Sequence, residues 1–210
     1  MFGLTGAVGA GKTTAAAAFG ARGCSVLDVD RMGHEALDAQ DVAGNVAREF
    51  GPDVTSEDGR IDRAALARRV FSDATLLRRL EAIVHPVVRA RVERELGTAR
   101  RAAPRAIVID CALLFESGLD RLCDATIVVD AADLVRERRV AASRGWTADE
   151  MRRREAAQIP AAEKKARAGR VLENDGSADD LRRRVGELLD ELAPVGTSGS
   201  ELPAAGRHER

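Results

Sequence analysis

The chain has 210 residues, 45% of them hydrophobic, and its 33 Lys and Arg residues nearly balance its 34 Asp and Glu residues, for a net charge of −1 at pH 7. This length suits one domain with an inserted subdomain, and the apolar content is enough to bury a sizeable core. The balanced charge gives no reason to expect nucleic-acid binding. The longest apolar runs, such as residues 15–19 and 125–129, are far shorter than the ~20 residues that span a bilayer, so we expect no membrane helix.

The three cysteines, Cys24, Cys111 and Cys123, are odd in number and contain no closely spaced pair. This pattern favours reduced, structural thiols over a disulfide framework or a metal site. Met1 is followed almost at once by the first predicted strand, which leaves no room for a cleaved signal peptide. We therefore expect a soluble, cytoplasmic protein.

The first predicted elements flank a phosphate-binding loop. Residues 2–5 are expected to form a short strand and residues 12–19 an alanine-rich helix, and the segment 6–14 between them fits the pattern G-x-x-x-x-G-K-[ST]. In such a loop the backbone N–H groups face phosphate oxygens, the lysine is a mobile cation, and the next hydroxyl can ligate Mg²⁺. The sequence therefore predicts a nucleoside triphosphate site. Its expected residues are Gly6, Gly9, Ala10, Gly11, Lys12, Thr13 and Thr14, with Thr13 also a metal ligand.

Two other interpretations of this glycine-rich segment are weaker. A merely flexible turn would not be expected to place a lysine and a hydroxyl at these offsets between a strand and a helix. A dinucleotide fingerprint, G-x-G-x-x-G, would require its third glycine at the position of Thr14. NAD is therefore not the expected ligand.

Apolar runs rich in β-branched residues recur along the chain at residues 24–29, 106–109 and 125–129, with a shorter candidate at 170–172. Helical stretches rich in Ala, Arg and Glu separate them. This alternation predicts an α/β fold, a parallel sheet flanked by helices.

The stretch between the second and third predicted strands has no strand signal. Its expected helices are residues 62–71, 75–84 and 86–101. A long helical insertion between neighbouring strands usually carries substrate contacts. We therefore expect residues 31–103 to bind the acceptor.

Arginine is dense at residues 136–154, where a lid facing the phosphates would lie. The same run is interleaved with acidic residues, so it also fits the solvated face of surface helices. Capping-box patterns at Thr147 and Ser177 predict helices over residues 148–158 and 178–192. From residue 193 to 210, Pro, Gly, Ser and Ala dominate, which predicts a disordered tail.

Carboxylates at the ends of the predicted strands are candidates for chemistry. Strand alternation would project Asp28 and Asp30 to one side, at the sheet edge where ligands bind. Either could accept the proton of a hydroxyl in phosphoryl transfer, and either could instead cap the helix that starts near Arg31. Asp110, which ends the third strand, is a candidate Mg²⁺ ligand or a partner for a loop amide.

Several short segments follow the phosphate loop in a fixed order. They are residues 27–30 (Leu-Asp-Val-Asp), 59–63 (Gly-Arg-Ile-Asp-Arg), 66–71, 83–86 (Ile-Val-His-Pro), 113–116 (Leu-Leu-Phe-Glu), 158–160 (Gln-Ile-Pro) and 174–176 (Asn-Asp-Gly). With Leu4-Thr5-Gly6 before the loop, this ordered series resembles the dephospho-coenzyme A kinase family from residue 2 to about 190.

The resemblance implies a phosphate-loop kinase domain over residues 1–192, with a core at about 1–30 and 104–192 and a lid at about 136–169. It implies transfer of the ATP γ-phosphoryl group to the ribose 3′-hydroxyl of dephospho-coenzyme A, the last step of coenzyme A synthesis. The implied catalytic residues are Asp30 as base, Lys12, Thr5 and Arg139. The implied acceptor contacts are Asp28, His85, Leu114 and Glu116, and the further nucleotide contacts are Arg144 and Asn174. From chemistry alone, a single His before Pro86 is more often structural.

Three positions depart from the family pattern. Ala7 replaces a common glycine, which the loop pattern permits, and Ala112 and Gly169 stand where proline and aspartate are usual. The last two departures concern the rigidity of the acceptor loop and the docking of the lid.

Two alternative functions remain at this point. Another small-molecule kinase, for a nucleotide, shikimate or gluconate, would share the loop, a carboxylate and a basic lid, and the helical insertion argues against it. A nucleotide-sensing module would not need both Lys12 and Asp30.

Overall fold

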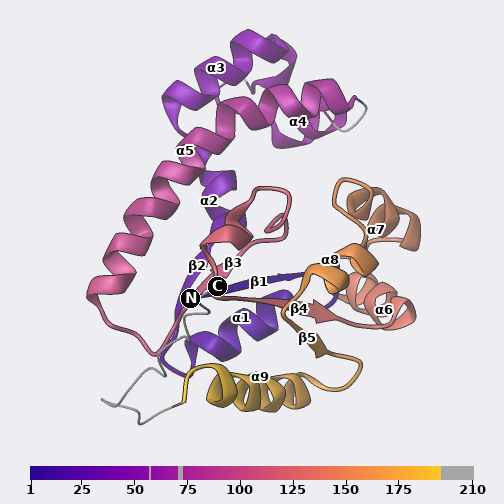
Figure 1. Cartoon of the computed structure of the whole chain (residues 1–210). Helices are drawn as coiled ribbons and strands as arrows, with labels where there is room; N and C mark the ends of the chain where they lie inside the picture. The colour runs from indigo at the N-terminus through magenta and orange to yellow at the C-terminus, as the bar shows by residue number, and fades with distance from the viewer. Residues whose placement is uncertain (57, 71–72, 195–210) are drawn as a thin grey trace, which may run out of the picture.

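The computed structural model of the protein describes residues 1–56, 58–70 and 73–194. Within this part of the chain, five parallel strands form one sheet in the order β2-β3-β1-β4-β5 (Figure 1). The strands are β1 (Phe2–Gly6), β2 (Ser25–Asp28), β3 (Ile107–Asp110), β4 (Ala125–Asp130) and β5 (Arg170–Glu173). The predicted α/β fold is confirmed, and the short candidate at 170–172 is a strand.

Helices cover both faces of the sheet. They are α1 (Lys12–Gly20), α2 (Val29–Ala36), α3 (Gln40–Phe50), α4 (Arg63–Val70), α5 (Ala74–Arg101), α6 (Asp133–Arg144), α7 (Ala148–Glu155), α8 (Ala161–Arg167) and α9 (Ala178–Leu192), with 3₁₀ turns η1 (Pro52–Val54) and η2 (Leu119–Leu122). In Figure 1, α1 and α9 lie together below the sheet, while α2 and the lower part of α5 lie on its other side.

Strand alternation divides the sheet core into two clusters. Val108 packs with Phe19 of α1 and Leu181 of α9. Ile109, the next residue, points to the other face and packs with Leu96 of α5. Burial on both faces explains why the strands are continuous apolar runs.

A third apolar cluster lies away from the sheet, in the helices at the top of Figure 1. Its buried residues, from α3, η1, α4 and the segment between η1 and α4, are Val42, Val46, Phe50, Val54, Ile61, Leu66 and Val70. Leu76, Leu80 and Val84 of α5 pack against them. Helix α5 runs from this cluster down to the sheet. The insertion therefore has its own core, and α2 and α5 connect it to the sheet.

The prediction of two helices that meet at Pro86 is wrong, because α5 continues through this residue. Proline removes one helical hydrogen bond, to the carbonyl of Ala82, and its ring strains the preceding turn. Val84 and Val87 pack on the third cluster, and Val88 packs on the second. These contacts hold both sides of Pro86 in one helix.

Two predicted helix starts are confirmed. The hydroxyl of Thr147 accepts a hydrogen bond from the Glu150 amide, and Ser177 and Asp180 form a reciprocal capping box. Helix α7 ends at Glu155, earlier than the predicted residue 158. Residues 71 and 195–210, and with them most of the predicted tail, lie outside the described residues. No helix in the described ranges is long and apolar enough to cross a membrane.

Candidate active site

The phosphate loop joins the last residue of β1, Gly6, to the first residue of α1, Lys12. Gly9 and Gly11 have φ angles of 79° and 101°, which favour glycine. A Cβ atom on Gly11 would lie 2.3 Å from Nδ2 of Asn174. Local backbone and tertiary packing therefore both require glycine here, as the motif predicts.

Lys12 lies between two carboxylates at the head of this loop. Its Nζ is 2.6 Å from Oδ2 of Asp30 and 2.6 Å from Oδ1 of Asp110. Burial disfavours the charged form of Lys12, but the two carboxylates outweigh this effect and raise its pKa. Burial also raises the pKa of Asp110 to about 6, against the opposing attraction of Lys12. The structure thus brings together three residues that were predicted separately.

Asp28 and Asp30 do not alternate on a strand, and that part of the prediction is wrong. The strand ends at Asp28, whose side chain caps α2 by accepting a 2.9 Å hydrogen bond from the Arg31 amide. Val29 is already helical, so Asp30 lies in the first turn of α2. Residues two apart at a helix start do not share a face. Of Asp28 and Asp30, only Asp30 bonds to Lys12, and it also accepts a 3.0 Å hydrogen bond from the amide of Ala112.

The three threonines of the candidate site differ in exposure. Thr5 is fully buried in β1, and its hydroxyl donates a 3.0 Å hydrogen bond to the carbonyl of Ala112. Thr13 is exposed in the first turn of α1, so its hydroxyl is accessible to a ligand, and Thr14 is half-buried. Ala10, within the loop, is fully buried.

Known proteins provide an independent comparison. A family model described as CoaE, dephospho-CoA kinase, matches residues 1–180. The chain belongs to the dephospho-CoA kinase family. A protein named dephospho-CoA kinase from Anaeromyxobacter dehalogenans is 43% identical over 98% of this chain and 97% of its own, and one from Symbiobacterium thermophilum is 41% identical over 98% and 85%.

Solved structures share this fold. The crystal structure of TT1252 from Thermus thermophilus has a TM-score of 0.79 and 41% sequence identity, over 91% of this chain and 96% of that one. A dephospho-CoA kinase structure from Campylobacter jejuni has a TM-score of 0.67 at 22% identity, over 91% and 96%, and supports the fold.

The residues expected at the acceptor are dispersed in this structure. His85 is exposed on α5 in the helical insertion. Leu114 is fully buried in the second sheet cluster, where it contributes to packing. Glu116 accepts a 2.9 Å hydrogen bond from the amide of Ile159. Of these three, only His85 and Glu116 have side chains with solvent access.

The residues expected at the nucleotide make contacts within the protein. Arg139 donates hydrogen bonds of 2.8 and 2.9 Å to the carbonyls of Asn174 and Gly176. The guanidinium of Arg144 lies over the ring of Trp146, 4.6 Å from its centroid. Asn174 is buried, and its amide donates a 2.7 Å hydrogen bond to the carbonyl of Ala10. Asn174 therefore supports the loop from below.

Arg136 is a buried loop contact that sequence reasoning missed. It donates a 3.0 Å hydrogen bond to the carbonyl of Val8 and pairs with Asp133 at 2.7 Å and with Glu155. It therefore ties the phosphate loop to α6 and α7. The density of arginines at 136–154 indicated a lid or a solvated surface and did not single out the buried one.

Lys164 of α8 was also missed. Only 1% of the residue is exposed, and Nζ lies 2.7 Å from the carbonyl of Ala112 and 2.6 Å from Oε1 of Gln158. The nearest carboxylate, Glu116, is 4.0 Å away. Burial lowers the pKa of Lys164. A lysine among many exposed basic residues carries no sequence signal of this kind.

Two of the residues that depart from the family pattern, Ala112 and Gly169, make backbone hydrogen bonds to side chains. Ala112 has an amide that donates to Asp30, which a proline would lack. The amide of Gly169 donates a 2.9 Å hydrogen bond to the hydroxyl of Thr126. A proline at position 112 would therefore remove the hydrogen bond to Asp30.

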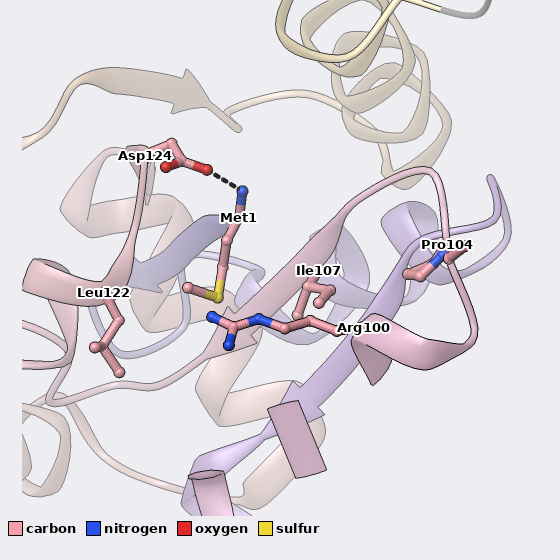
Figure 2. A pocket seen from close by; sticks show the side chains of 7 residues that line it. Met1, Arg100, Pro104, Ile107, Leu122 and Asp124 are labelled. Atoms are coloured by element: carbon pink, nitrogen blue, oxygen red, sulfur yellow. Dashed lines mark hydrogen bonds and ion pairs between the residues drawn. The ribbon is translucent and has the colours of Figure 1, made fainter. Parts of the chain in front are cut away.

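Two hollows in the described part of the chain differ in character. The larger, about 450 Å³, lies where β1, β3 and β4 begin, at the end of the sheet opposite the phosphate loop. Figure 2 shows the side chains that line it. Its lining residues are Met1, Arg100, Ala103, Pro104, Ile107, Leu122 and Asp124. The smaller, about 130 Å³, lies between the loop and the lid and is lined by Ala7, Glu155, Gln158, Ile159, Pro160, Ala161 and Lys164. Only the smaller one borders the candidate site.

Proposed function

We propose that this protein transfers the γ-phosphoryl group of ATP to the ribose 3′-hydroxyl of dephospho-CoA, which yields CoA and ADP. The family match over residues 1–180 carries this proposal. The cluster of Lys12, Asp30 and Asp110 at the end of the phosphate loop supports it, because phosphoryl transfer needs a phosphate cradle and a group that orients the hydroxyl.

The loop and α1 bind the phosphates. The backbone N–H groups of residues 9–14 and the positive end of the α1 dipole face the β- and γ-phosphates. Lys12 then turns from the carboxylates to the phosphate oxygens. This movement releases Oδ2 of Asp30, which accepts the proton of the attacking 3′-hydroxyl.

The residues fit a magnesium ion. The exposed Thr13 hydroxyl and the carboxylate of Asp110 are oxygen donors of the kind Mg²⁺ prefers, so these two residues would hold the ion. When bound, the ion neutralises charge on the β- and γ-phosphate oxygens.

The helical insertion of residues 31–103 provides the acceptor side, with His85 and the loop that contains Glu116. Its separate apolar cluster supports treating it as a unit distinct from the core at about 1–30 and 104–192. In the lid at about 136–169, Arg139 and Arg144 are the candidates to contact phosphoryl oxygens, since a guanidinium can bind two of them at once.

The state of the cysteines supports a reducing compartment such as the cytoplasm. Cys24, Cys111 and Cys123 are free thiols. Burial raises the pKa of all three, to about 12 for Cys111 and about 11 for Cys123. They remain protonated and unreactive, as structural thiols do.

An acceptor panel tests the proposal against other small-molecule kinases of this architecture. The purified protein is incubated with ATP and Mg²⁺, and ADP release is measured with dephospho-CoA, AMP, adenosine, shikimate or no acceptor. We expect turnover with dephospho-CoA to exceed every other reaction strongly. Equal or better turnover of a different acceptor would contradict the assignment. ADP release independent of any acceptor would indicate an ATPase, and no ADP release in any reaction would indicate a sensor.

A further inference from the structure

The peptide group of Ala112 connects three elements around the candidate base. Its carbonyl accepts hydrogen bonds from Thr5 of β1, at 3.0 Å, and from Lys164 of α8, at 2.7 Å. Its N–H donates to Oδ1 of Asp30 in α2, at 3.0 Å. Both lone pairs of the carbonyl and the single amide proton are therefore in use. The orientation of this peptide decides where the carboxylate of Asp30 is held.

The use of a buried lysine to bind a carbonyl costs stability. Its ammonium is almost completely buried, and its two hydrogen-bond acceptors, the Ala112 carbonyl and Gln158, are uncharged. A buried cation without a carboxylate in direct contact costs stability, and an apolar side chain could fill the same space without that cost. Buried charges of this kind gather at functional sites.

The charge of Lys164 acts on Asp30 through the peptide. A cation at the carbonyl oxygen polarises the peptide and strengthens its N–H as a donor, because linked hydrogen bonds reinforce each other in a low dielectric. The two ends of this path are the ammonium of Lys164 and the carboxylate of Asp30.

The hydrogen bond from the Ala112 amide to Asp30 becomes more important when ATP binds. In the described structure Asp30 bonds to Lys12 and to Ala112. If Lys12 turns to the phosphates, the amide of Ala112 is the contact of these two that stays with the carboxylate. The peptide must then keep Asp30 aimed at the acceptor hydroxyl.

The segment that carries Lys164 is attached to the same loop at a second point. The amide of Ile159 donates to Glu116, and Gln158 accepts from Lys164. The base of the lid and the loop after β3 are thus joined at two places. A change in the lid can reach Asp30 through this connection.

We propose that Lys164 is a positioning residue that holds the Ala112 peptide and, through it, the carboxylate of Asp30 in the orientation needed for proton transfer. This inference rests on the proposed function, because it assumes that Asp30 is the base. The inference adds Lys164, a residue of the lid, to the residues that position the base Asp30.

The test compares Lys164→Met with Lys165→Met. Lys165 is the next residue of α8, is 42% exposed on its side chain and pairs with Asp130 at 2.7 Å, so its variant also loses one ammonium and one short polar contact. For Lys164→Met we expect kcat to fall by roughly 10- to 100-fold, the usual range for loss of a partner that orients a ligand or base. KM for ATP should change by less than about threefold, because the loop binds the phosphates. Lys165→Met should keep kcat within about twofold of wild type, because the Lys165 ammonium bonds to Asp130 and not to the Ala112 peptide.

The melting temperature of each variant separates positioning from folding. A folded Lys164→Met protein with kcat within twofold of Lys165→Met would overturn the inference, and so would a rise in KM for ATP as large as the loss in kcat. If Lys164→Met does not fold, Lys164→Gln, which keeps a short neutral donor, is judged by the same criteria. All rates use the acceptor that the panel identifies. Failure of wild type on dephospho-CoA would therefore reject the proposed function and not this inference.

Discussion

The side-chain amide of Asn174 donates a buried 2.7 Å hydrogen bond to the carbonyl of Ala10, although 164 residues separate them. Asn174 follows β5 and Ala10 lies in the loop after β1, so this bond joins two strands that do not pair with each other. The Asn174 side chain occupies the space beside Gly11, where a Cβ would meet its amide nitrogen. Support of the phosphate loop by a residue near the end of the domain is a consequence of the fold.

Asn174→Ala should weaken ATP binding. The variant leaves the carbonyl of fully buried Ala10 without this partner, which costs about 1–3 kcal/mol, and the loop loses its prearranged shape. We expect KM for ATP to rise by about 10-fold, the equivalent of 1.4 kcal/mol. Initial rates at varied ATP measure it. The matched control is Asn45→Ala on the exposed face of α3, where KM for ATP should remain that of wild type.

Lys12→Ala should abolish efficient use of ATP while the protein stays folded. The side chain faces the phosphate site and the carboxylates of Asp30 and Asp110, not an apolar cluster. We expect kcat/KM for ATP to fall by more than about 100-fold, with an unchanged far-UV circular dichroism spectrum. Turnover at the wild-type rate would remove the loop lysine from the mechanism.

The residues that sequence reasoning found and missed differ in what determines them. The phosphate loop is local, since glycine dihedrals, a lysine and a hydroxyl within one segment define it. Asp110 was found because the end of a parallel strand is a predictable place. Arg136 and Lys164 were missed because their burial depends on how α6 and α8 pack against the loop and the sheet. No spacing along the chain shows that packing.

The errors at Asp30 and Pro86 have different origins. A one-residue shift in the end of β2 changed strand alternation into a helix start, and it separated Asp28 from Asp30. Apolar contacts on two clusters kept α5 continuous where local chemistry predicts a break. At Asp28 a local helix cap set the boundary, whereas at Pro86 tertiary packing overrode local chemistry.

The free energy of unfolding should depend on pH through the titration of Asp110. Burial raises its pKa from 3.8 to about 6, so between these values the folded protein binds more protons than the unfolded chain. The contribution of Asp110 to the free energy of unfolding therefore falls as pH rises through this window. Asp110→Asn removes this titration. We expect the unfolding free energy of wild type, minus that of the variant, to decrease from about pH 4 to about pH 6 in urea titrations. A difference that stays constant with pH would show that Asp110 has an ordinary pKa.

The lid should report nucleotide binding through Trp146, the single tryptophan of the chain. Its ring is contacted by Arg144 and by Arg154, whose guanidinium carbons lie 4.6 and 4.0 Å from the ring centroid. If Arg144 leaves the ring to bind phosphate, the environment of the indole changes. We expect ATP to alter the tryptophan emission of wild type and to have little effect on that of Arg144→Ala. An equal response in both proteins would place the phosphate contact elsewhere.

Asp30→Asn is the sharpest test of the mechanism, because it keeps the size of the side chain and removes the charge that accepts the hydroxyl proton. If Asp30 is the base, kcat should fall by roughly 10²- to 10⁴-fold, the usual contribution of a positioned acid or base. ATP affinity should change far less, since the loop supplies most of that binding. Asp28→Asn is the matched control, two residues earlier.

Asp28 caps α2, and asparagine caps a helix as well as aspartate does, so Asp28→Asn should retain both activity and melting temperature. Rates at saturating ATP and acceptor, with ATP affinity from equilibrium titration, compare the two variants directly. An Asp30→Asn protein that keeps at least about a third of wild-type kcat would lie outside the range expected for loss of a general base. The proton would then leave to solvent or to another group, and the contact between Asp30 and Lys12 would serve only to hold the empty loop.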